Sequence, residues 1–364
     1  MSRHRIGQIV VTLALLALSG CKSRESASYA AASAIASAAP PPEDVVIPES
    51  TLEIFTPLPD RFENTENPIT EEKVTLGRML FFETRLSKNQ DISCNSCHDL
   101  ATFGVDGKAV STGHRGQQGS RSAPTVYNTG AHLAQFWDGR ARNLEAQAKG
   151  PILNPIEMAM GNEKKVLAVI ASIPGYVEAF QRAFPGQKAP ITYDNVGNAI
   201  GAFERKLVTP SRFDKFLRGD KTAITNLEKT GVLAFVSVGC PTCHNGPALG
   251  GQSFQKLGVM KPFETKDLGR FDVTKAEADR HVFRVPSLRN IEKTAPYLHD
   301  GTKTSLEEMV RLMANHQLGK QPNDADVAAI VAFLKSLTGE PPAEYITKPE
   351  LPPSGPRTPK PDAR

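Results

Sequence analysis

The sequence lacks a strong excess of charge of one sign, and it lacks a long hydrophobic run. Lysine and arginine number 43 against 39 aspartate and glutamate residues, a balance that argues against nucleic-acid binding. The apolar run from Ile9 to Leu18 is interrupted only by Thr12 but is too short to span a bilayer, and no later segment has the length and apolarity of a membrane helix. Cysteine is also scarce, with five residues in 364.

The first 21 residues have the pattern of an export signal. Arg3 and Arg5 precede the apolar run, and the tetrad LSGC ends at Cys21. A short apolar run behind a basic start suits the h-region of such a signal. The tetrad resembles the lipobox of bacterial lipoproteins, in which the cysteine is acylated. We therefore expect residues 1–21 to be a lipoprotein signal and Cys21 to anchor the protein to a membrane in the periplasm. An ordinary secretory signal with a leftover cysteine is the alternative, and it also exports the protein.

The remaining chain divides into a tether, two domains and a tail. Residues 22–51 are rich in Ala, Ser and Pro, a composition that offers little to bury and predicts a flexible tether. A Pro-rich tail is expected at 341–364. The length between them suits about two domains of ordinary size, which we place at 52–207 and 208–340.

Apart from Cys21, every cysteine lies in one of two matching motifs. The motifs are Cys94-Asn-Ser-Cys97-His98 and Cys240-Pro-Thr-Cys243-His244. In C-x-x-C-H, the two thiols form thioethers to the vinyl groups of a haem, and the adjoining histidine reaches the iron from the same face. Two copies in an exported chain predict two covalently attached c-type haems, with His98 and His244 as iron ligands.

Three other uses of these cysteines fit less well. A thioredoxin-like redox pair does not explain the histidine in both copies. A zinc site built from both motifs would usually have a far shorter interval between them. Vicinal disulfide chemistry is possible in an oxidising compartment.

The surroundings of both motifs have helical periodicity. Residues 71–82 start with acidic side chains and then place apolar ones at helical spacing, and residues 226–240 lead directly into the second motif. Further helices are expected at 162–172, 193–207, 305–317 and 324–337, with proline or glycine between them. The sequence thus predicts a mostly α protein of two cytochrome c-like domains, each holding one haem.

The identity of the second iron ligand decides between electron transfer and chemistry. Leu306, Met309, Val310 and Met313 share one face of the predicted helix 305–317, so two thioethers are available to the second haem. A thioether opposite a histidine raises the potential of the iron and suits an electron-transfer haem. Methionine on an apolar face is more often a core residue, and His316, one turn beyond Met313, is a rival ligand.

Several segments together resemble the bacterial dihaem cytochrome c peroxidases. They are FFETRLSKNQDISCNSCHDL, the loop STGHRGQQGSRS around His114, QFWDGRARNLEAQAKGPILNPIEMAM, CPTCHNGPALGG, VPSLRNIEKTAPYLHDG and the 305–317 helix. They occur in the family's order from about residue 52 to residue 340. The resemblance implies a peroxidase that reduces hydrogen peroxide to water with electrons from a small cytochrome c or cupredoxin.

The resemblance also implies roles for individual residues. The haem of Cys94, Cys97 and His98 would be the low-potential, peroxidatic centre, and the haem of Cys240, Cys243 and His244 would be the high-potential centre that receives electrons. The remaining residues with implied roles are Met313 as distal ligand of the second haem, His114 as distal histidine of the first, Glu157 as catalytic carboxylate, Gln147 as its amide neighbour and Trp137, the single tryptophan, between the haems.

A calcium ion and a homodimer are further expectations from the family. Thr294 and Pro296 match residues that bind calcium through backbone carbonyls. Ser122 matches the side-chain ligand, where asparagine is usual, and a serine hydroxyl is a shorter and weaker donor. Calcium is therefore the least secure of these expectations.

Two other functions keep both haems. One is that of the enzymes that mature methylamine dehydrogenase by oxidising tryptophans on a partner protein. Those enzymes have a tyrosine where this chain has Met313, which argues against that function. The other is a non-enzymatic electron-relay cytochrome, in which Glu157 and Gln147 would have no task. For a peroxidase, Glu157 would transfer a proton between the two oxygens of the peroxide, and His114, in its glycine-rich loop, would block the first iron until the second haem is reduced.

Overall fold

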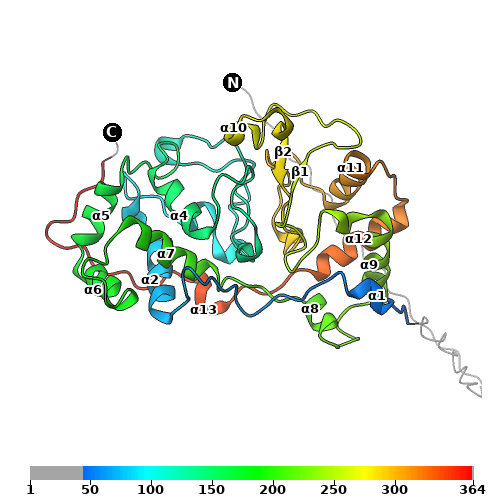
Figure 1. The fold of residues 1–364 in the computed structure, drawn as a ribbon, viewed down its shortest axis with the longest axis horizontal. Coiled ribbons are helices and arrows are strands. Elements are labelled where there is room, and N and C mark those ends of the chain that lie inside the picture. Colours follow the sequence, from blue (N-terminus) through cyan, green and yellow to red (C-terminus); the bar gives the residue numbers. More distant parts are fainter. Residues whose placement is uncertain (1–43, 363–364) are drawn as a thin grey trace, which may run out of the picture. The chain divides into compact units, whose positions relative to one another are not determined.

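The computed structural model describes residues 44–362, and it is mostly helical, as the sequence predicts (Figure 1). The predicted signal at 1–21, Cys21 and most of the predicted tether lie outside the described residues. The α-helices are α1 (Glu49–Leu52), α2 (Glu71–Phe81), α3 (Cys94–Cys97), α4 (Leu144–Leu153), α5 (Glu163–Ala171), α6 (Pro174–Ala183), α7 (Tyr193–Glu204), α8 (Arg212–Leu217), α9 (Asn226–Val238), α10 (Phe271–Thr274), α11 (Leu306–Leu318), α12 (Asp324–Ser336) and α13 (Ala343–Ile346). Strands β1 (Phe254–Lys256) and β2 (Val282–Arg284) pair antiparallel, with Phe254 opposite Arg284. None of the helices in the described range combines the length and apolarity needed to cross a bilayer.

Seven of the described helices, α2, α4, α5, α7, α9, α11 and α12, begin at a side chain that accepts a hydrogen bond from the first turn. Thr70 accepts from the backbone of Lys73 at the start of α2, and Thr225 and Glu228 form a reciprocal capping box at the start of α9. Such caps satisfy backbone N–H groups that have no partner inside the helix. All six helices expected from periodicity are present, as α2, α5, α7, α9, α11 and α12.

Helices α4 and α6 were not predicted. Helix α4 contains Gly150 and Pro151, residues that normally interrupt a helix. Its last turn nevertheless forms, and Asn154 closes it by donating to the carbonyls of both residues. Helix α6 starts at Pro174, whose fixed φ suits a first helical position.

Each half of the chain contains a pair of helices that come into close contact at a glycine. In the first pair, a Cβ on Gly77 of α2 would lie 1.9 Å from the carbonyl oxygen of Ala199 on α7. In the second, a Cβ on Gly231 of α9 would lie 2.0 Å from the carbonyl oxygen of Ala329 on α12. Because only glycine permits such an approach, the two halves use the same contact to place their helices beside the C-x-x-C-H segments.

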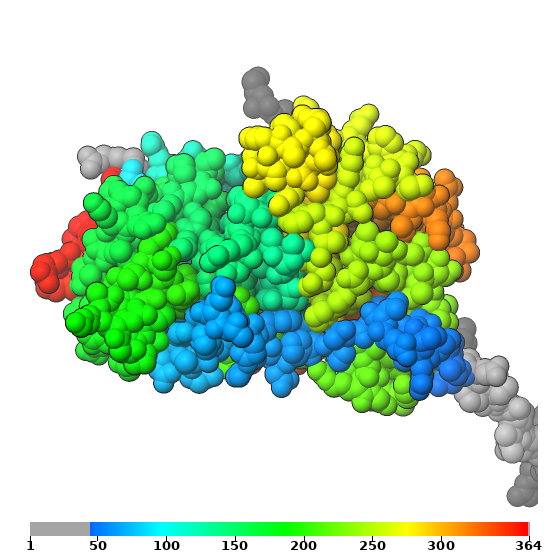
Figure 2. All heavy atoms as spheres, in the orientation of Figure 1, coloured from blue at the N-terminus to red at the C-terminus, as the bar shows by residue number. Residues whose placement is uncertain are grey.

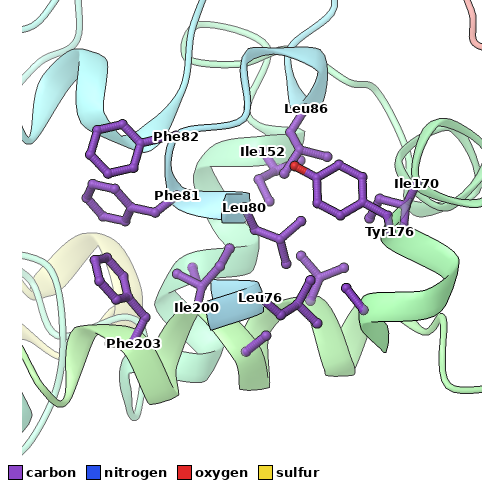
Figure 3. Packing of buried hydrophobic residues seen from close by; sticks show 14 of the residues in the cluster. Leu76, Leu80, Phe81, Phe82, Leu86, Ile152, Ile170, Tyr176, Ile200 and Phe203 are labelled. Carbon is purple, nitrogen blue, oxygen red and sulfur yellow. The ribbon is translucent and has the colours of Figure 1, made fainter. Parts of the chain in front are cut away.

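The chain has two separate hydrophobic clusters, one for each helix pair. The first cluster lies between α2, α4, α5, α6 and α7, where Leu76, Leu80, Ile200 and Phe203 face one another (Figure 3). The second cluster lies between α8, α9 and α12. At its centre, the Phe333 ring lies 5.0 Å from the Phe213 ring and 5.2 Å from the Phe235 ring. Two clusters agree with the two cytochrome c-like domains predicted from the sequence.

The segment from Ile47 to Phe55 packs on the second cluster, although the sequence predicted that the first domain begins at residue 52. The Phe55 ring lies 5.2 Å from the Phe213 ring, and the Lys229 Nζ atom lies 2.6 Å from a carboxylate oxygen of Asp44. Figure 2 shows this segment, in blue, lying against yellow-green atoms of the second half of the chain. Ile47, which the sequence placed in the tether at 22–51, is buried as well, because an apolar side chain gains more from burial than from exposure in a free tether.

The tail expected at 341–364 packs against the first domain. Tyr345 belongs to the first cluster, with its ring 5.5 Å from the Phe203 ring. The Arg85 guanidinium donates to the carbonyl oxygen of Pro352 over 2.9 Å, and Ser172 and Thr358 share a hydrogen bond of 2.9 Å. The tail therefore returns from the second domain to the first, next to α5 and α6 (Figure 1).

Candidate functional site

Two cavities lie inside the described chain, and each contains one C-x-x-C-H motif. The first cavity, of about 1350 Å³ with the space at its mouth included, is lined by Cys94, Cys97 and His98. The second cavity, of about 1640 Å³ measured in the same way, is lined by Cys240, Cys243 and His244. In each cavity the two thiols and the histidine of the motif face the same space, as the attachment of one haem requires.

Both motif histidines are held in the same way. The Nδ1 atom of His98 lies 3.3 Å from the carbonyl oxygen of Gly104, and the Nδ1 atom of His244 lies 3.1 Å from that of Leu249. A carbonyl oxygen only accepts, so Nδ1 carries the proton and the Nε2 lone pair is free. Burial lowers the pKa of His98 and lowers the pKa of His244 to about 4. Both rings are therefore neutral, which is the form that binds a metal.

The four cysteine thiols of the motifs are reduced and face the cavities. Burial raises the pKa of Cys94, above all, and of Cys97, and it raises the pKa of Cys240 to about 12. A reactive redox cysteine has a lowered pKa in an electropositive setting. The raised pKa values do not fit a thioredoxin-like redox pair.

The two cavities share a wall that contains an unpaired positive charge. Arg284 lines both cavities and is 2% exposed. Its guanidinium donates only to the carbonyl oxygens of Phe136 and Val285, over 3.3 and 3.4 Å, and within residues 44–362 it forms no ion pair with a carboxylate. Burial lowers the pKa of Arg284 to about 10. Because an uncompensated buried charge is strongly destabilising, this position fits a ligand that brings its own anionic groups, as the two propionates of a haem do.

Met309 and Met313 both line the second cavity, whereas His316 does not. Met309 also packs against the second hydrophobic cluster. The His316 ring points to another part of the molecule, where its Nδ1 atom lies 2.9 Å from the Lys261 carbonyl oxygen and Phe263 packs on it edge to face. The geometry thus favours a thioether over His316 at this cavity.

Glu157 and Gln147 line the first cavity together. Gln147 comes from α4, and Glu157 from the turn that follows it. The Nδ2 atom of Asn154 donates to Glu157 Oε1 over 3.0 Å. Burial raises the pKa of Glu157, while the charge of Arg140 and the bond from Asn154 act in the opposite direction. The cavity therefore has a half-buried carboxyl group and an amide on one side, a combination suited to moving a proton.

His114 lies next to Glu157, but its ring is not part of the cavity wall. It begins a short 3-10 turn (His114–Gly116) and is 5% exposed. Its backbone N–H donates to the carbonyl oxygens of Ile156 and Glu157, over 2.9 and 2.8 Å. Gly113 and Ser111, from the same loop, do line the cavity. The arrangement seen here is therefore one in which the His114 loop is docked beside Glu157 and the ring is turned away from the cavity.

Trp137 lies in the wall that both cavities share, as does Ser122. The indole N–H of Trp137 donates to the carbonyl oxygen of Ser122 over 2.9 Å. Thr294 and Pro296, which the family resemblance links to calcium, line the second cavity together with Ser122. The structure thus brings the three expected calcium residues to one cavity.

Glu204 and Arg284 are among the cavity residues that the sequence did not indicate. Glu204, the last residue of α7, lines the first cavity and is 3% exposed. Arg284 lines both cavities from β2. Glu204 had a visible signal, because an acidic residue follows the apolar stretch AIGAF of the predicted helix. For Arg284, the apolar residues on either side of it in HVFRVP could have indicated that its side chain is buried.

Comparisons with known proteins agree with this geometry. Residues 71–222 match the family model of the di-haem cytochrome c peroxidases. The chain is 51% identical over 296 residues to a cytochrome c551 peroxidase of Nitrosomonas europaea, covering 80% of this chain and 87% of the relative. It is 46% identical over 316 residues to a cytochrome c551 peroxidase of Pseudomonas aeruginosa, covering 85% and 90%. A crystal structure of a MauG-like protein associated with microbial copper homeostasis superposes with a TM-score of 0.69 at 29% identity, covering 84% of this chain and 97% of that one.

Proposed function

The chain belongs to the di-haem cytochrome c peroxidase family, and we propose that it reduces hydrogen peroxide to water with electrons from a small cytochrome c or cupredoxin. The reaction consumes one peroxide, two electrons and two protons and releases two waters. The observation that carries the proposal is the position of Glu157, a half-buried carboxyl group in the same cavity as Cys94, Cys97 and His98.

Two covalently bound c-type haems, when bound, supply the iron that exchanges electrons with peroxide and with the donor. Cys94 and Cys97 would hold one haem by thioethers in the first cavity, with His98 Nε2 directed at its iron. Cys240, Cys243 and His244 would do the same in the second cavity. Met313 would supply the thioether opposite His244, and Trp137 would lie in the wall between the two groups.

Glu157 would perform the proton transfer of the reaction. Its carboxylate would take the proton from one peroxide oxygen and return it to the other, so that the leaving oxygen departs as water. A positioned acid or base of this kind contributes about 10² to 10⁴ in rate. The bond from Asn154 fixes the orientation of the carboxylate, and the Gln147 amide would hold the peroxide in place by hydrogen bonding.

His114 would gate access to the first cavity. In the fully oxidised protein its ring would occupy the position that peroxide needs, and reduction at the second cavity would shift the loop to the docked arrangement beside Glu157. The His114→Gly variant tests this. The oxidised variant should lose the low-spin signal of a bis-histidine iron and react with peroxide without prior reduction. An oxidised wild type that is already high-spin and fully active would refute the gate and leave the peroxidase proposal intact.

The cellular setting is part of the proposal. A lipid on Cys21 would anchor the protein to a membrane in the periplasm, where peroxide removal and small electron carriers coincide. A calcium ion would bind at Thr294 and Pro296, with Ser122 as a short side-chain ligand, and two copies of the chain would form a homodimer. Mass spectrometry of the mature N-terminus, metal analysis and sedimentation each test one of these points.

Oxidation of a partner protein is the second candidate, because the solved MauG-like structure covers most of this chain. Met313, in the wall of the second cavity, favours the peroxidase, since a thioether suits an iron that takes up electrons one at a time. A non-enzymatic relay cytochrome is the third candidate.

One experiment separates these functions. Purified protein with both haems is reduced and mixed with hydrogen peroxide, while visible spectra and the oxidation of a reduced small cytochrome c are followed. The peroxidase should oxidise two molecules of the cytochrome for each peroxide, repeatedly. A relay cytochrome would leave peroxide untouched, and an enzyme of the MauG type would react with peroxide but turn over poorly with the cytochrome.

A further inference from the structure

Glu204 is a buried carboxyl group in the first cavity that the proposed proton transfer does not use. It ends α7 and lines the cavity together with Cys94, Cys97 and His98. Its side chain is 3% exposed, and within the described residues its buried Oε2 atom has no hydrogen-bond partner. Glu157, the other carboxyl group of this cavity, differs because Asn154 donates to it.

Within residues 44–362, Glu204 forms no ion pair, and the nearby Arg205 favours its charged form only in part. The adjacent guanidinium of Arg205 is engaged by Glu145 of α4, with Nε and Nη2 each 3.0 Å from a carboxylate oxygen. Glu145 also accepts hydrogen bonds from Asn64 and Asn67. Arg205 and Glu145 therefore form a closed pair, and Glu145 adds a like charge near Glu204. On α3, the titratable group that interacts with Glu204 is the Cys94 thiol. The charge of Glu204 helps to raise the pKa of this thiol.

These surroundings favour the protonated form of Glu204. Burial and, to a lesser extent, the charge of Glu145 raise the pKa of Glu204 to about 8, with only Arg205 acting in the opposite direction. A carboxyl group that titrates near neutral pH inside a cavity responds strongly to any change of charge there. It is also close to Cys94, which is one of the two predicted attachment points of the first haem.

We propose that Glu204 is the proton-accepting group that balances the charge of the electron entering the first cavity. The inference depends on the proposed attachment of a haem at Cys94 and Cys97. When one electron from the donor protein arrives there, the Glu204 carboxylate takes up one proton from solvent. When the electron leaves, the carboxyl group gives the proton back, so that the net charge of this buried region stays the same.

The sign of the effect follows from linkage. An added electron makes the cavity more negative, which raises the proton affinity of Glu204, so its pKa is higher in the reduced state than in the oxidised state. Between these two pKa values, reduction takes up a proton, and the midpoint potential falls as pH rises. The slope approaches about 59 mV per pH unit, the equivalent of a tenfold change for a one-electron couple.

The test is a redox titration of the first haem, followed by its visible spectrum, between about pH 6 and pH 10. The wild type should show a window in which the potential falls with pH, and Glu204→Gln, which has the same shape but cannot titrate, should lose it. Glu83→Gln is the matched control, because Glu83 is 1% exposed, is held by Arg85 and Tyr176, and lines neither cavity. It should keep the wild-type window.

A second variant and a second measurement guard against a loss of folding in Glu204→Gln. Glu204→Asp keeps a titratable group and should move the window without abolishing it. The reduced-minus-oxidised infrared difference spectrum of the wild type should contain a protonated carboxyl band that Glu204→Gln lacks. An unchanged window in Glu204→Gln, or a flat potential in the wild type, would overturn the inference. Because the potential requires only an attached haem, poor peroxide turnover would refute the proposed function and leave this result standing.

Discussion

The backbone N–H of His114 donates a hydrogen bond to the carbonyl oxygen of Glu157 over 2.8 Å, and a second one to Ile156 over 2.9 Å. These two bonds join the glycine-rich loop to the turn that holds the carboxyl group of the first cavity. The contact is possible because the preceding residue is glycine. A Cβ on Gly113 would lie 2.1 Å from the Ile156 carbonyl oxygen and 2.8 Å from the Glu157 Cα atom. Movement of the loop and the position of Glu157 are therefore coupled.

Replacing Gly113 with alanine should separate the loop from Glu157. The added methyl group has no room, so the loop or the turn must move by more than 1 Å, a displacement that can cost about 10²-fold in rate. We expect peroxide turnover to fall at least about tenfold, with both haems still attached. Gly119→Ala is the control, because its nearest neighbour would be 3.8 Å away. Equal turnover in the two variants would show that the docked loop does not position Glu157.

Glu157 should be essential for turnover. Glu157→Gln keeps the size of the side chain but cannot carry a proton between the peroxide oxygens, so the rate of peroxide reduction should fall at least about a hundredfold. Haem content and the visible spectrum should stay the same. The exposed Glu163→Gln, at the start of α5, is a matched control. Near-normal turnover in Glu157→Gln would remove this residue from the mechanism.

Met313 should set the potential of the second haem. Met313→His replaces a thioether with an imidazole, which should lower the midpoint potential of that haem and slow its reduction by the donor. Met309→Leu keeps the volume of a residue that packs on the second cluster and should leave the potential unchanged. A redox titration measures both. A shift in Met309→Leu with none in Met313→His would assign the ligand to Met309.

The buried pair of Asp214 and Arg289 should be a major contributor to stability. Arg289 donates to Asp214 over 2.7 Å, and the side chains are 0% and 1% exposed. Leu58 and Ser211 donate to the same carboxylate. Asp214→Ala leaves the guanidinium buried and unpaired, which should cost about 3 to 5 kcal/mol of unfolding free energy. Denaturant unfolding followed by circular dichroism measures the loss, with the exposed Asp60→Ala as control.

The same pair predicts how stability depends on acid. Burial acts to raise the pKa of Asp214, but the charge of Arg289 and the hydrogen bonds from Leu58 and Ser211 outweigh it, so the pKa is below its usual value. The contribution is therefore fully present above the unfolded pKa of about 3.9 and is lost as pH falls through the lower folded pKa. The difference in stability between wild type and Asp214→Ala should shrink in that acidic window. A difference that stays constant down to the lowest accessible pH would contradict this account.

The sequence was sufficient for features that depend on neighbouring residues. Two C-x-x-C-H motifs predicted the two cofactor sites, because thioether attachment and iron ligation need those groups within one turn of chain. Apolar periodicity predicted α9 and the five other helices, and the structure adds the capping box of Thr225 with Glu228 at the start of α9. The family resemblance then pointed to Glu157 and Gln147, which the structure brings to the same cavity.

Tertiary structure decided what depends on contacts between distant segments. His316 and Met313 lie on the same helix, yet only the fold directs Met313 to the second cavity and His316 to Lys261. Arg284 and Glu204 are ordinary charged residues in the sequence, and only the fold buries them without a partner of opposite charge in an ion pair. Capping hydrogen bonds and apolar spacing depend on residues within one turn of each other, so the sequence reveals them. The burial of a side chain and the absence of a partner depend on the packing of distant segments, so the sequence does not reveal them.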